Sequence, residues 1–289
     1  MSNLVEIKKR IESISSTIKV TKVMKMIATA KIAKIKPMMG VVKRYNDDAD
    51  KVLAMFMKNT ENKSAMKCYF ESNGSNNVLL LLLSSDKGTC GSINTNVFKD
   101  FVNEVKQYKK DGKKVSVMPI GKKAVKYIQT NLKKLGIELF SNEEIDAEYC
   151  NGELISNIVN QILLAYNDNK FEEVSIVSHK FKNIITCFVE KQQLLPASQV
   201  SVDEASFINV SEDTSTVSSI MEYYVRTKIY NAYVSNIASI ISSRMNAMDN
   251  ATKNGQEIIN DLKIQYNKGR QAHITSELSD IVSGFEAIS

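Results

Sequence analysis

The end of the chain carries an uninterrupted helical pattern. Between Asp203 and Ser289 there is no proline, and there are only three glycines. Apolar or small residues recur every three to four positions, which marks one face of a helix. A helix of about seventy residues would be roughly 105 Å long, so this segment must extend well beyond a compact domain. The predicted row consists of Val234, Ile237, Ile241, Met245, Met248, Thr252, Gly255, Ile258, Leu262, Tyr266, Gly269 and His273.

The start of the chain shows the same spacing. Two helices with apolar stripes can cover both stripes by packing side by side, and we expect an antiparallel two-stranded coiled coil. Proline removes a backbone donor, so Pro37 predicts a kink, after which the helix resumes to about Lys58. The N-terminal stripe consists of Leu4, Ile7, Ile11, Ile14 and Ile18. Small residues that would allow close approach are Ala28, Thr29, Ala30, Ala33, Ala247, Ala251 and Gly255.

Strands and helices alternate between these two ends. Residues 78–83 form a continuous apolar run, typical of a strand buried on both faces. This alternation predicts a small open Rossmann-like α/β sheet with right-handed crossovers, so the fold class is α/β with long helical extensions. Further strands are expected at 115–120 and 174–178, an antiparallel edge strand from 184 to about 194, and helices at 93–110, 122–135 and 154–167.

The chain is expected to divide into five segments. The terminal coiled-coil helices occupy residues 1–60 and 216–289, and the central α/β domain occupies residues 77–200. A polar linker, 61–76, and a connector, 201–215, join them.

Positive charge is concentrated at the N-terminus. The chain carries a net charge of +6, and residues 1–44 hold eleven Lys or Arg against two Glu, an excess of 11 − 2 = +9. A basic arm suggests an acidic partner, which could be nucleic acid, anionic lipid or an acidic protein loop. A solvated helix face explains the same charges, and the composition leaves both interpretations open.

Several function classes are disfavoured. The longest apolar run is far shorter than the roughly 20 residues of a membrane span, and the charged first residues predict no secretory signal. The cysteines are widely separated, which is typical of reduced thiols in a reducing or matrix-like compartment. The two histidines, His179 and His273, lie far apart, so no zinc site is expected. The cysteines are Cys68, Cys90, Cys150 and Cys187.

A glycine-containing turn follows the buried strand. Residues 84–92, Ser-Ser-Asp-Lys-Gly-Thr-Cys-Gly-Ser, open a helix at the place where many α/β enzymes hold phosphate. The spacing is G-x-x-G, which differs from the dinucleotide fingerprint, and this favours a structural turn over a nucleotide site. The residues assigned to this structural turn are Asp86, Gly88, Cys90 and Gly91.

The sequence lacks familiar catalytic motifs. It contains no G-x-S-x-G, no H-E-x-x-H and no Cys–His pair in a recognisable context, so no catalytic residue is assigned. Arg270 and Gln271, near the far end of the last helix, are well placed to bind carboxylates through the fork of the guanidinium group.

Three segments together resemble the gamma subunit of F-type ATP synthase. Residues 18–31 contain Thr-Lys-Val-Met-Lys-Met-Ile-Ala, and residues 85–92 contain Ser-Asp-Lys-Gly-Thr-Cys-Gly-Ser. The third segment includes Arg-Met-Asn-Ala-Met-Asp-Asn-Ala at 244–251 and Tyr-Asn-Lys-Gly-Arg-Gln-Ala-His-Ile-Thr at 266–275. The three occur in the family's order, and the resemblance runs end to end.

The resemblance implies a non-catalytic central shaft, one copy per complex, inside a ring of three alpha and three beta subunits. Its base would contact a membrane rotor c-ring and epsilon- or delta-type subunits, and ATP, ADP and Mg would bind the alpha and beta partners rather than this chain. The basic N-terminal helix would meet an acidic loop of the beta subunits. The expected location is the matrix side of the mitochondrial inner membrane, with the cytoplasmic face of a bacterial plasma membrane as the alternative.

Residue roles follow from the same resemblance. The residues implied to couple rotation to the beta subunits are Met24, Arg244, Arg270, Gln271, Thr275 and Glu277. The implied apical bearing consists of Ile281, Val282, Phe285 and Ile288. Thr89, His273 and the bulky tail after Gly284 depart from the family pattern. Two competing functions are a nucleotide-binding α/β enzyme with helical arms and a basic coiled-coil protein that binds nucleic acid.

Overall fold

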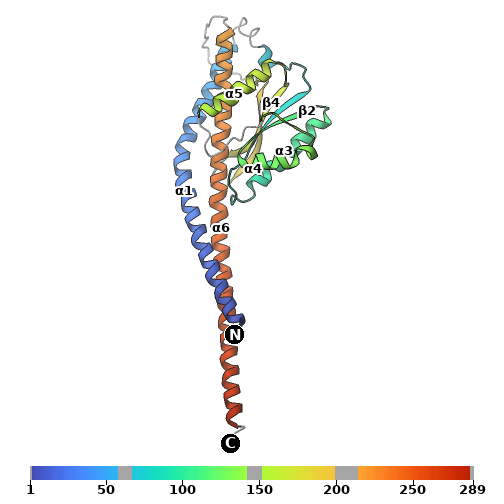
Figure 1. Ribbon diagram of the computed structural model, residues 1–289. Coiled ribbons are helices and arrows are strands. Elements are labelled where there is room, and N and C mark those ends of the chain that lie inside the picture. The colour runs from blue at the N-terminus through green and yellow to red at the C-terminus, as the bar shows by residue number, and fades with distance from the viewer. Residues whose placement is uncertain (1, 58–66, 142–151, 199–213, 287–289) are drawn as a thin grey trace. The chain divides into compact units, whose positions relative to one another are not determined.

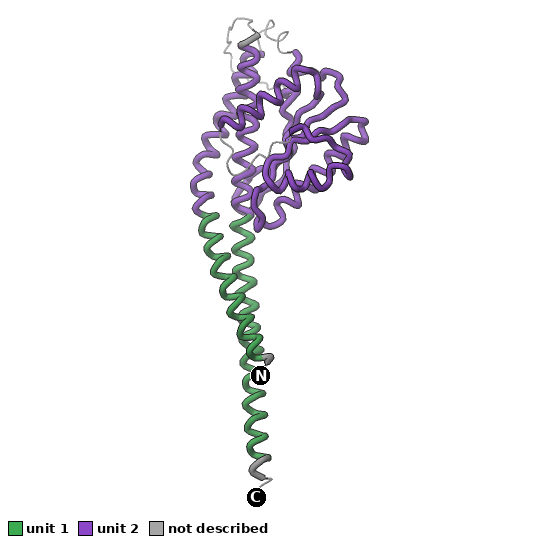
Figure 2. The backbone as a smooth tube through the Cα atoms, viewed as in Figure 1, with its two compact units in different colours: residues 1–29, 244–289 green, residues 30–243 purple. Residues whose placement is uncertain are grey.

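The computed structural model describes residues 2–57, 67–141, 152–198 and 214–286. The chain forms two compact units, one of residues 1–29 and 244–289 and the other of residues 30–243 (Figure 2). Two long helices, α1 (Ser2–Met57) and α6 (Thr214–Glu286), contribute to both units. The predicted fold class is confirmed, and most of the predicted connector, 201–215, lies outside the described residues. None of the helices in the described ranges is long and apolar enough to cross a bilayer.

The unit of residues 30–243 contains a five-stranded sheet in the order β3-β2-β1-β4-β5 (Figure 1). β1 pairs in parallel with both β2 and β4, β2 pairs in parallel with β3, and β5 is an antiparallel edge strand on β4. The strands are β1 (Asn77–Leu83), β2 (Lys114–Ile120), β3 (Glu138–Leu139), β4 (Glu173–Phe181) and β5 (Cys187–Leu195).

Helices cover both faces of this sheet. The helices α3 (Ile93–Lys110) and α4 (Lys122–Leu135) pack on one face, where they bury Leu80 and Leu82 of β1. The other face carries α5 (Gly152–Asn167) together with the stretches of α1 and α6 that belong to this unit. Because β1 is covered on both sides, its sequence is continuously apolar, as predicted.

The unit of residues 1–29 and 244–289 is an antiparallel helix pair. Residues spaced alternately three and four apart form a contact stripe on each helix, which we call the seam, and this is the spacing of a coiled coil. Contacts join Leu4 to Gly269 and Ile18 to Gly255, so the two helices run in opposite directions. The seam contains Leu4, Ile7, Ile11, Ile14, Ile18, Thr21, Lys25 and Ala28 of α1, and Met245, Met248, Thr252, Gly255, Ile259, Leu262, Tyr266, Gly269 and His273 of α6.

The predicted row on α6 was wrong at one position. Ile258 is exposed, whereas Ile259 is buried in the seam. When steps of three and four residues alternate strictly, the next seam residue after Gly255 lies four positions further along the chain, at Ile259. Only this step keeps the stripe on one side of the helix. Of the small residues expected at the interface, Ala28 and Gly255 are buried. Those that are exposed instead are Thr29, Ala30, Ala33 and Ala251.

Pro37 lies inside α1, and the helix resumes beyond it to Met57, one residue before the predicted end at about Lys58. The kink at Pro37 stays a prediction. Pro37 removes the hydrogen bond to the carbonyl of Ala33, and both residues are exposed. Water can therefore satisfy that carbonyl, and the buried side of the helix is undisturbed. The short strand β3 was not predicted, since two residues carry too little periodicity to be recognised.

Gly255 provides a test of the seam. A Cβ at this position would lie 2.9 Å from Ile18 Cγ1, so Gly255→Leu should lower the free energy of unfolding by about 1–3 kcal/mol through overpacking. Gly40→Ala is the matched control, since nothing lies within 4 Å of its added Cβ. It should raise the free energy of unfolding by about 0.5–1 kcal/mol. Denaturant unfolding of the purified chain measures both, and a Gly255→Leu chain as stable as wild type would contradict the seam packing.

Candidate functional site

The strand order places a potential ligand crevice between β1 and β4. The chain leaves β1 through α3 toward β2, and it reaches β4 through α5, on the other side of β1. The order of the strands thus reverses at β1, and the connections that follow β1 and β4 lead away from each other. Ligands of α/β proteins bind in the crevice between two such connections, at the carboxyl ends of the strands. The segments at this crevice are the turn of residues 84–92 and the end of β4, from Ser178 onward.

Side chains after β1 satisfy the amino-terminal end of α4. The amide of Ala124 donates to Ser84 Oγ at 2.7 Å, and the amide of Lys122 donates to Asp86 Oδ1 at 3.1 Å. The first N–H groups of a helix attract anions, and here a carboxylate of the chain itself takes that position. Gly121 permits the close approach, since it has φ +98° and a Cβ there would lie 2.6 Å from the Ser84 carbonyl oxygen.

The turn itself contains two residues with a left-handed backbone. Gly91 has φ 66° and Thr89 has φ 56°. This conformation suits glycine, but it is strained for a β-branched residue. Cys90 between them is buried. A Cβ on Gly88 would meet nothing closer than a lysine Nζ at 4.0 Å, so the geometry gives a reason for Gly91 but none for Gly88.

The helix α6 packs against the end of β4 through two hydrogen bonds. The amide of Phe181 donates to Ser235 Oγ at 2.8 Å, and the amide of His179 donates to Asn236 Oδ1 at 3.3 Å. Asn236 is buried. A buried backbone amide without a partner is costly, so these side chains complete the end of the strand.

Two further serines of α6 bind the neighbouring loops. Ser243 Oγ donates to the carbonyl of Cys90 at 2.6 Å, in the turn after β1, and Ser242 Oγ donates to the carbonyl of Ile184, between β4 and β5. The same helix therefore contacts both connections that border the crevice. The place where a related sheet would bind a ligand is therefore bordered by α6 of this chain.

These α6 residues were not among the site residues predicted from the sequence. Small polar residues recur at three- to four-residue spacing in an otherwise apolar stretch of the helix, and this spacing is the signal that could have identified them. The residues are Ser235, Asn236, Ser239, Ser242 and Ser243.

His179 lies at the same junction and is buried. Its Nδ1 is 3.3 Å from Asn236 Oδ1. Burial lowers the pKa of His179. The hydrogen bonds to Asn236 and to the Ile93 carbonyl and the negative charge of Asp100 raise the pKa, but the effect of burial is larger. A neutral, enclosed imidazole is suited to packing rather than to proton exchange with a substrate.

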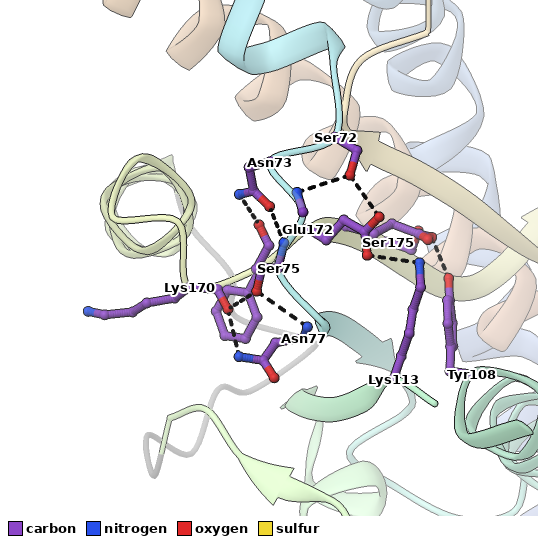
Figure 3. A network of polar contacts seen from close by, with 12 residues as sticks. Ser72, Asn73, Ser75, Asn77, Tyr108, Lys113, Lys170, Glu172 and Ser175 are labelled. Carbon is purple, nitrogen blue, oxygen red and sulfur yellow. Dashed lines mark hydrogen bonds and ion pairs between the residues drawn. The ribbon is translucent and has the colours of Figure 1, made fainter. Parts of the chain in front are cut away.

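A polar network joins the opposite end of the sheet (Figure 3). Glu172 accepts a hydrogen bond from Ser72 Oγ at 2.8 Å and lies 3.0 Å from Lys113 Nζ. Both contacts lower the pKa of Glu172, and the hydrogen bond from Ser72 has the larger effect. The network thus ties the segment before β1 to the loops before β2 and β4.

A second part of this network surrounds Glu173. Ser175 Oγ donates to Glu173 Oε1 at 2.7 Å, Tyr108 donates to the same carboxylate, and Lys191 Nζ lies 3.3 Å from it. Lys191 also lies 3.3 Å from Glu104. Burial is the largest effect that raises the pKa of Tyr108, and the hydrogen bond to Glu173 raises it further. The phenol therefore keeps its proton. These charges pair with one another, as in a structural network, and among the described residues no cluster of His, Cys, Asp or Glu is arranged to hold a metal.

The predicted coupling residues lie on the two helices. Met24 is half-buried, whereas Arg270 and Gln271 are exposed. Thr275 Oγ1 donates to the Gln271 carbonyl at 2.9 Å, and Glu277 lies 3.2 Å from His273 Nδ1. Residues 270–277 therefore form one group on the surface of α6. Arg244 is buried and is about 39 Å away along the helix, at 1.5 Å per residue.

The end of α6 exposes large apolar side chains. Of the predicted bearing residues, Ile281 and Val282 are 66% and 55% exposed, and the side chains of Phe285 and Ile288 lie outside the described residues. Ile274 and Leu278, which the sequence analysis did not assign to the bearing, are 46% and 58% exposed. These four side chains form an exposed apolar row at the end of α6.

Comparison with known proteins gives a family for this architecture. The family model described as ATP synthase matches residues 3–288. The ATP synthase gamma chain of Pelagibacter ubique is 31% identical, and the alignment covers 100% of both chains. The gamma chain of Christiangramia forsetii is 32% identical, again over 100% of both chains.

The chain belongs to the ATP synthase gamma-chain family. Among solved structures, the central stalk of Tetrahymena thermophila mitochondrial ATP synthase is similar, with a TM-score of 0.60 and 26% identity over 80% of this chain and 99% of that one. A chain of the Euglena gracilis mitochondrial enzyme has the same fold, with a TM-score of 0.70 and 16% identity over 99% and 95% of the two chains.

A gamma chain is the central-stalk subunit of ATP synthase and is not itself catalytic. The geometry agrees with this role. In this gamma chain α6 is hydrogen-bonded to both connections that border the crevice, and the charged groups at the other end of the sheet are paired internally.

The strained turn gives a stability prediction. Thr89→Gly should raise the free energy of unfolding by about 1 kcal/mol, because glycine adopts the left-handed backbone without the penalty of a side chain. Gly91→Ala is the opposite control and should lower it by about the same amount. Denaturant unfolding measures both, and a Thr89→Gly chain less stable than wild type would show that the threonine hydroxyl outweighs the strain.

His179 gives a pH prediction. Its pKa in the folded chain is below the usual histidine value, so the unfolded chain binds the proton more readily. The stabilisation from neutral His179 is therefore complete above about pH 6.5, which is the pKa of histidine in the unfolded chain. It is lost as the pH falls toward the lower pKa of His179 in the folded chain. His179→Gln should flatten this part of the stability profile. Unfolding curves measured from pH 7.5 to 5 (about the range in which histidine titrates) test this, and the same slope in wild type and variant would contradict it.

Proposed function

We propose that this chain is the rotating shaft of a proton-translocating F-type ATP synthase and transmits torque from a membrane rotor ring to the catalytic beta subunits. The observation that carries the proposal is the apolar row at the end of α6. Ile274, Leu278, Ile281 and Val282 are all exposed, although such side chains normally avoid water. A sleeve of three alpha and three beta subunits would cover them.

The attachment of α6 to the sheet supports the same role. Ser235, Asn236 and Ser243 hold one stretch of α6 against the strand ends, and the helix continues without a break to Glu286. Torque applied to the sheet domain would therefore pass directly into the helix. A continuous helix has no backbone hinge at which such torque would be lost.

Contacts to the beta subunits are proposed for a small set of helix residues. Arg270 and Gln271 have exposed side chains, and a guanidinium group binds carboxylates in a directed, bidentate manner. A few such contacts transmit force, and an otherwise weakly bound surface lets the shaft pass three equivalent subunits. The proposed coupling residues are Met24, Arg244, Arg270, Gln271, Thr275 and Glu277, and the proposed bearing is Ile281, Val282, Phe285 and Ile288.

The partners and the location complete the proposal. The chain would be present once per complex, with three alpha and three beta subunits, epsilon- or delta-type subunits and a membrane c-ring. Its basic first 44 residues suit an acidic loop of the beta subunits. We place it on the matrix side of the mitochondrial inner membrane, on the form of its Lys-Gly-x-Cys-Gly-Ser and Met-Asp-Asn-Ala motifs. The bacterial alternative differs only in the membrane. The five segments predicted from the sequence remain our proposed division of the chain.

Purification of the native complex tests the function. A tag on this chain should recover alpha, beta and c-ring subunits in constant ratio, and depletion of the chain should abolish ATP synthesis in membranes. Subcellular fractionation then distinguishes the two locations. Recovery of nucleic acid or of the chain alone, with ATP synthesis intact after depletion, would refute the proposal.

The coupling residues give a sharper prediction. Arg270→Ala with Gln271→Ala should lower the rate of ATP synthesis about fivefold or more, since loss of a well-placed interface contact costs about 1 kcal/mol or more. The helix should remain folded, because both side chains are exposed. Lys263→Ala with Gln256→Ala, which likewise removes one positive charge and one amide from exposed positions on α6, is the control and should have little effect. Unchanged synthesis in the first variant would remove Arg270 and Gln271 from the coupling set.

A further inference from the structure

An ion pair joins α1 to α6 inside the unit of residues 30–243. Lys228 Nζ lies 2.7 Å from each carboxylate oxygen of Asp50. The Lys228 side chain is only 9% exposed and that of Asp50 22% exposed. The ammonium group also lies 5.2 Å from the centre of the Tyr224 ring, and Asn46 Nδ2 donates to Asp50 Oδ2 at 3.4 Å.

The surroundings of this pair are apolar. Neighbouring positions on both helices belong to the buried core that faces α5 and the sheet. Asp50 and Lys228, with Asn46 beside them, therefore form a polar layer next to this apolar core. The core residues nearest in sequence are Ala49, Leu53 and Phe56 of α1 and Tyr224, Val225, Ile229 and Ala232 of α6.

A buried ion pair contributes little net stability compared with well-packed apolar residues, because both charges lose their hydration. Its main effect is on specificity. Apolar residues of similar size can pack in several alignments, whereas a buried charge that loses its partner is strongly unfavourable. A single polar position in an apolar helix contact is known to fix the alignment of two helices in this way.

We propose that the Asp50–Lys228 pair fixes the axial alignment of α1 against α6, and that these two positioning residues are needed for efficient coupling of rotation to ATP synthesis. If α1 slides by one helical turn along α6, Asp50 comes to lie beside Tyr224, Val225, Asn231 or Ala232 instead of Lys228, and none of these side chains carries a positive charge. The pair opposes such a slide when α6 carries torque. This inference rests on the proposed shaft function.

The unit of residues 1–29 and 244–289 repeats the arrangement in a more exposed form. Lys25 Nζ lies 2.5 Å from Asp249 Oδ1, and the hydroxyl groups of Thr21 and Thr252 are 2.8 Å apart. Hydrogen bonds from Lys25 and Lys253 lower the pKa of Asp249, and the bond from Lys25 has the larger effect. Because both charged side chains remain partly in water, this pair constrains alignment less than Asp50 and Lys228 do.

Three variants of the assembled complex separate alignment from stability. Lys228→Met leaves Asp50 without its partner, and it should lower both thermal stability and coupling. Asp50→Leu with Lys228→Met replaces both charged groups by apolar side chains. It should restore thermal stability while the number of protons pumped per ATP hydrolysed stays lower by about twofold or more. The exchange Asp50→Lys with Lys228→Asp should restore both quantities.

The matched control removes an ion pair that cannot affect alignment. Glu222 and Arg226 pair within α6, one turn apart, so Glu222→Ala with Arg226→Ala should leave coupling unchanged. Wild-type coupling in the Asp50→Leu and Lys228→Met double variant would overturn the inference. Failure of the shaft function itself is a different result, because depletion of the wild-type chain would then leave ATP synthesis intact.

Discussion

Hydrogen bonds from α6 to the backbone at the end of the sheet are the interaction on which the rest of the structure depends. The amides of His179 and Phe181 and the carbonyl of Cys90 find their partners in Asn236, Ser235 and Ser243. A buried backbone group left unpaired costs about 1–3 kcal/mol, so α6 cannot leave this position without a substantial loss of stability. The sheet thereby holds one stretch of a very long helix in a fixed position.

This interaction also lies beside the place where a nucleotide-type sheet would bind its ligand. Comparable sheets bind ligands in the crevice between β1 and β4, and here α6 is hydrogen-bonded to the turn after β1 and to the end of β4. The amino-terminal end of α4, which could attract a phosphate, is instead satisfied by Ser84 and Asp86. The same architecture that serves catalysis elsewhere serves attachment in this gamma chain, and the helices present the surfaces for other subunits.

Local patterns in the sequence were enough to predict much of this fold. The apolar run of β1 and the spacing in α3 and α4 predicted those elements, because both faces of the sheet are covered and each helix has one buried side. Ile258 was assigned to the buried row in place of Ile259 because steps of three and of four residues both fit a helical stripe until the partner helix is known. The continuation of α1 beyond Pro37 was predicted as well, because the amphipathic spacing resumes after the proline.

The polar side of α6 was missed for a related reason. Serine and asparagine in a helix usually face solvent, so the three- to four-residue spacing of Ser235, Asn236 and Ser243 did not by itself indicate a buried contact. Their role depends on backbone groups in β4 and in the turn after β1, more than fifty residues away in the chain. Pairs such as Asp50 with Lys228 are equally invisible without the fold, because nothing in the sequence indicates which charges meet across two helices.

A cross-link between α6 and β4 tests most directly whether the sheet and this stretch of helix move as one body. Ser235→Cys and Phe181→Cys, in a chain whose four native cysteines are replaced by serine, can be joined by a short thiol-specific reagent in the assembled complex. The account predicts that the joined complex synthesises ATP at the rate of the same complex before cross-linking, since the two elements do not separate during rotation. Loss of ATP synthesis on cross-linking, with recovery when a cleavable reagent is cut, would contradict it.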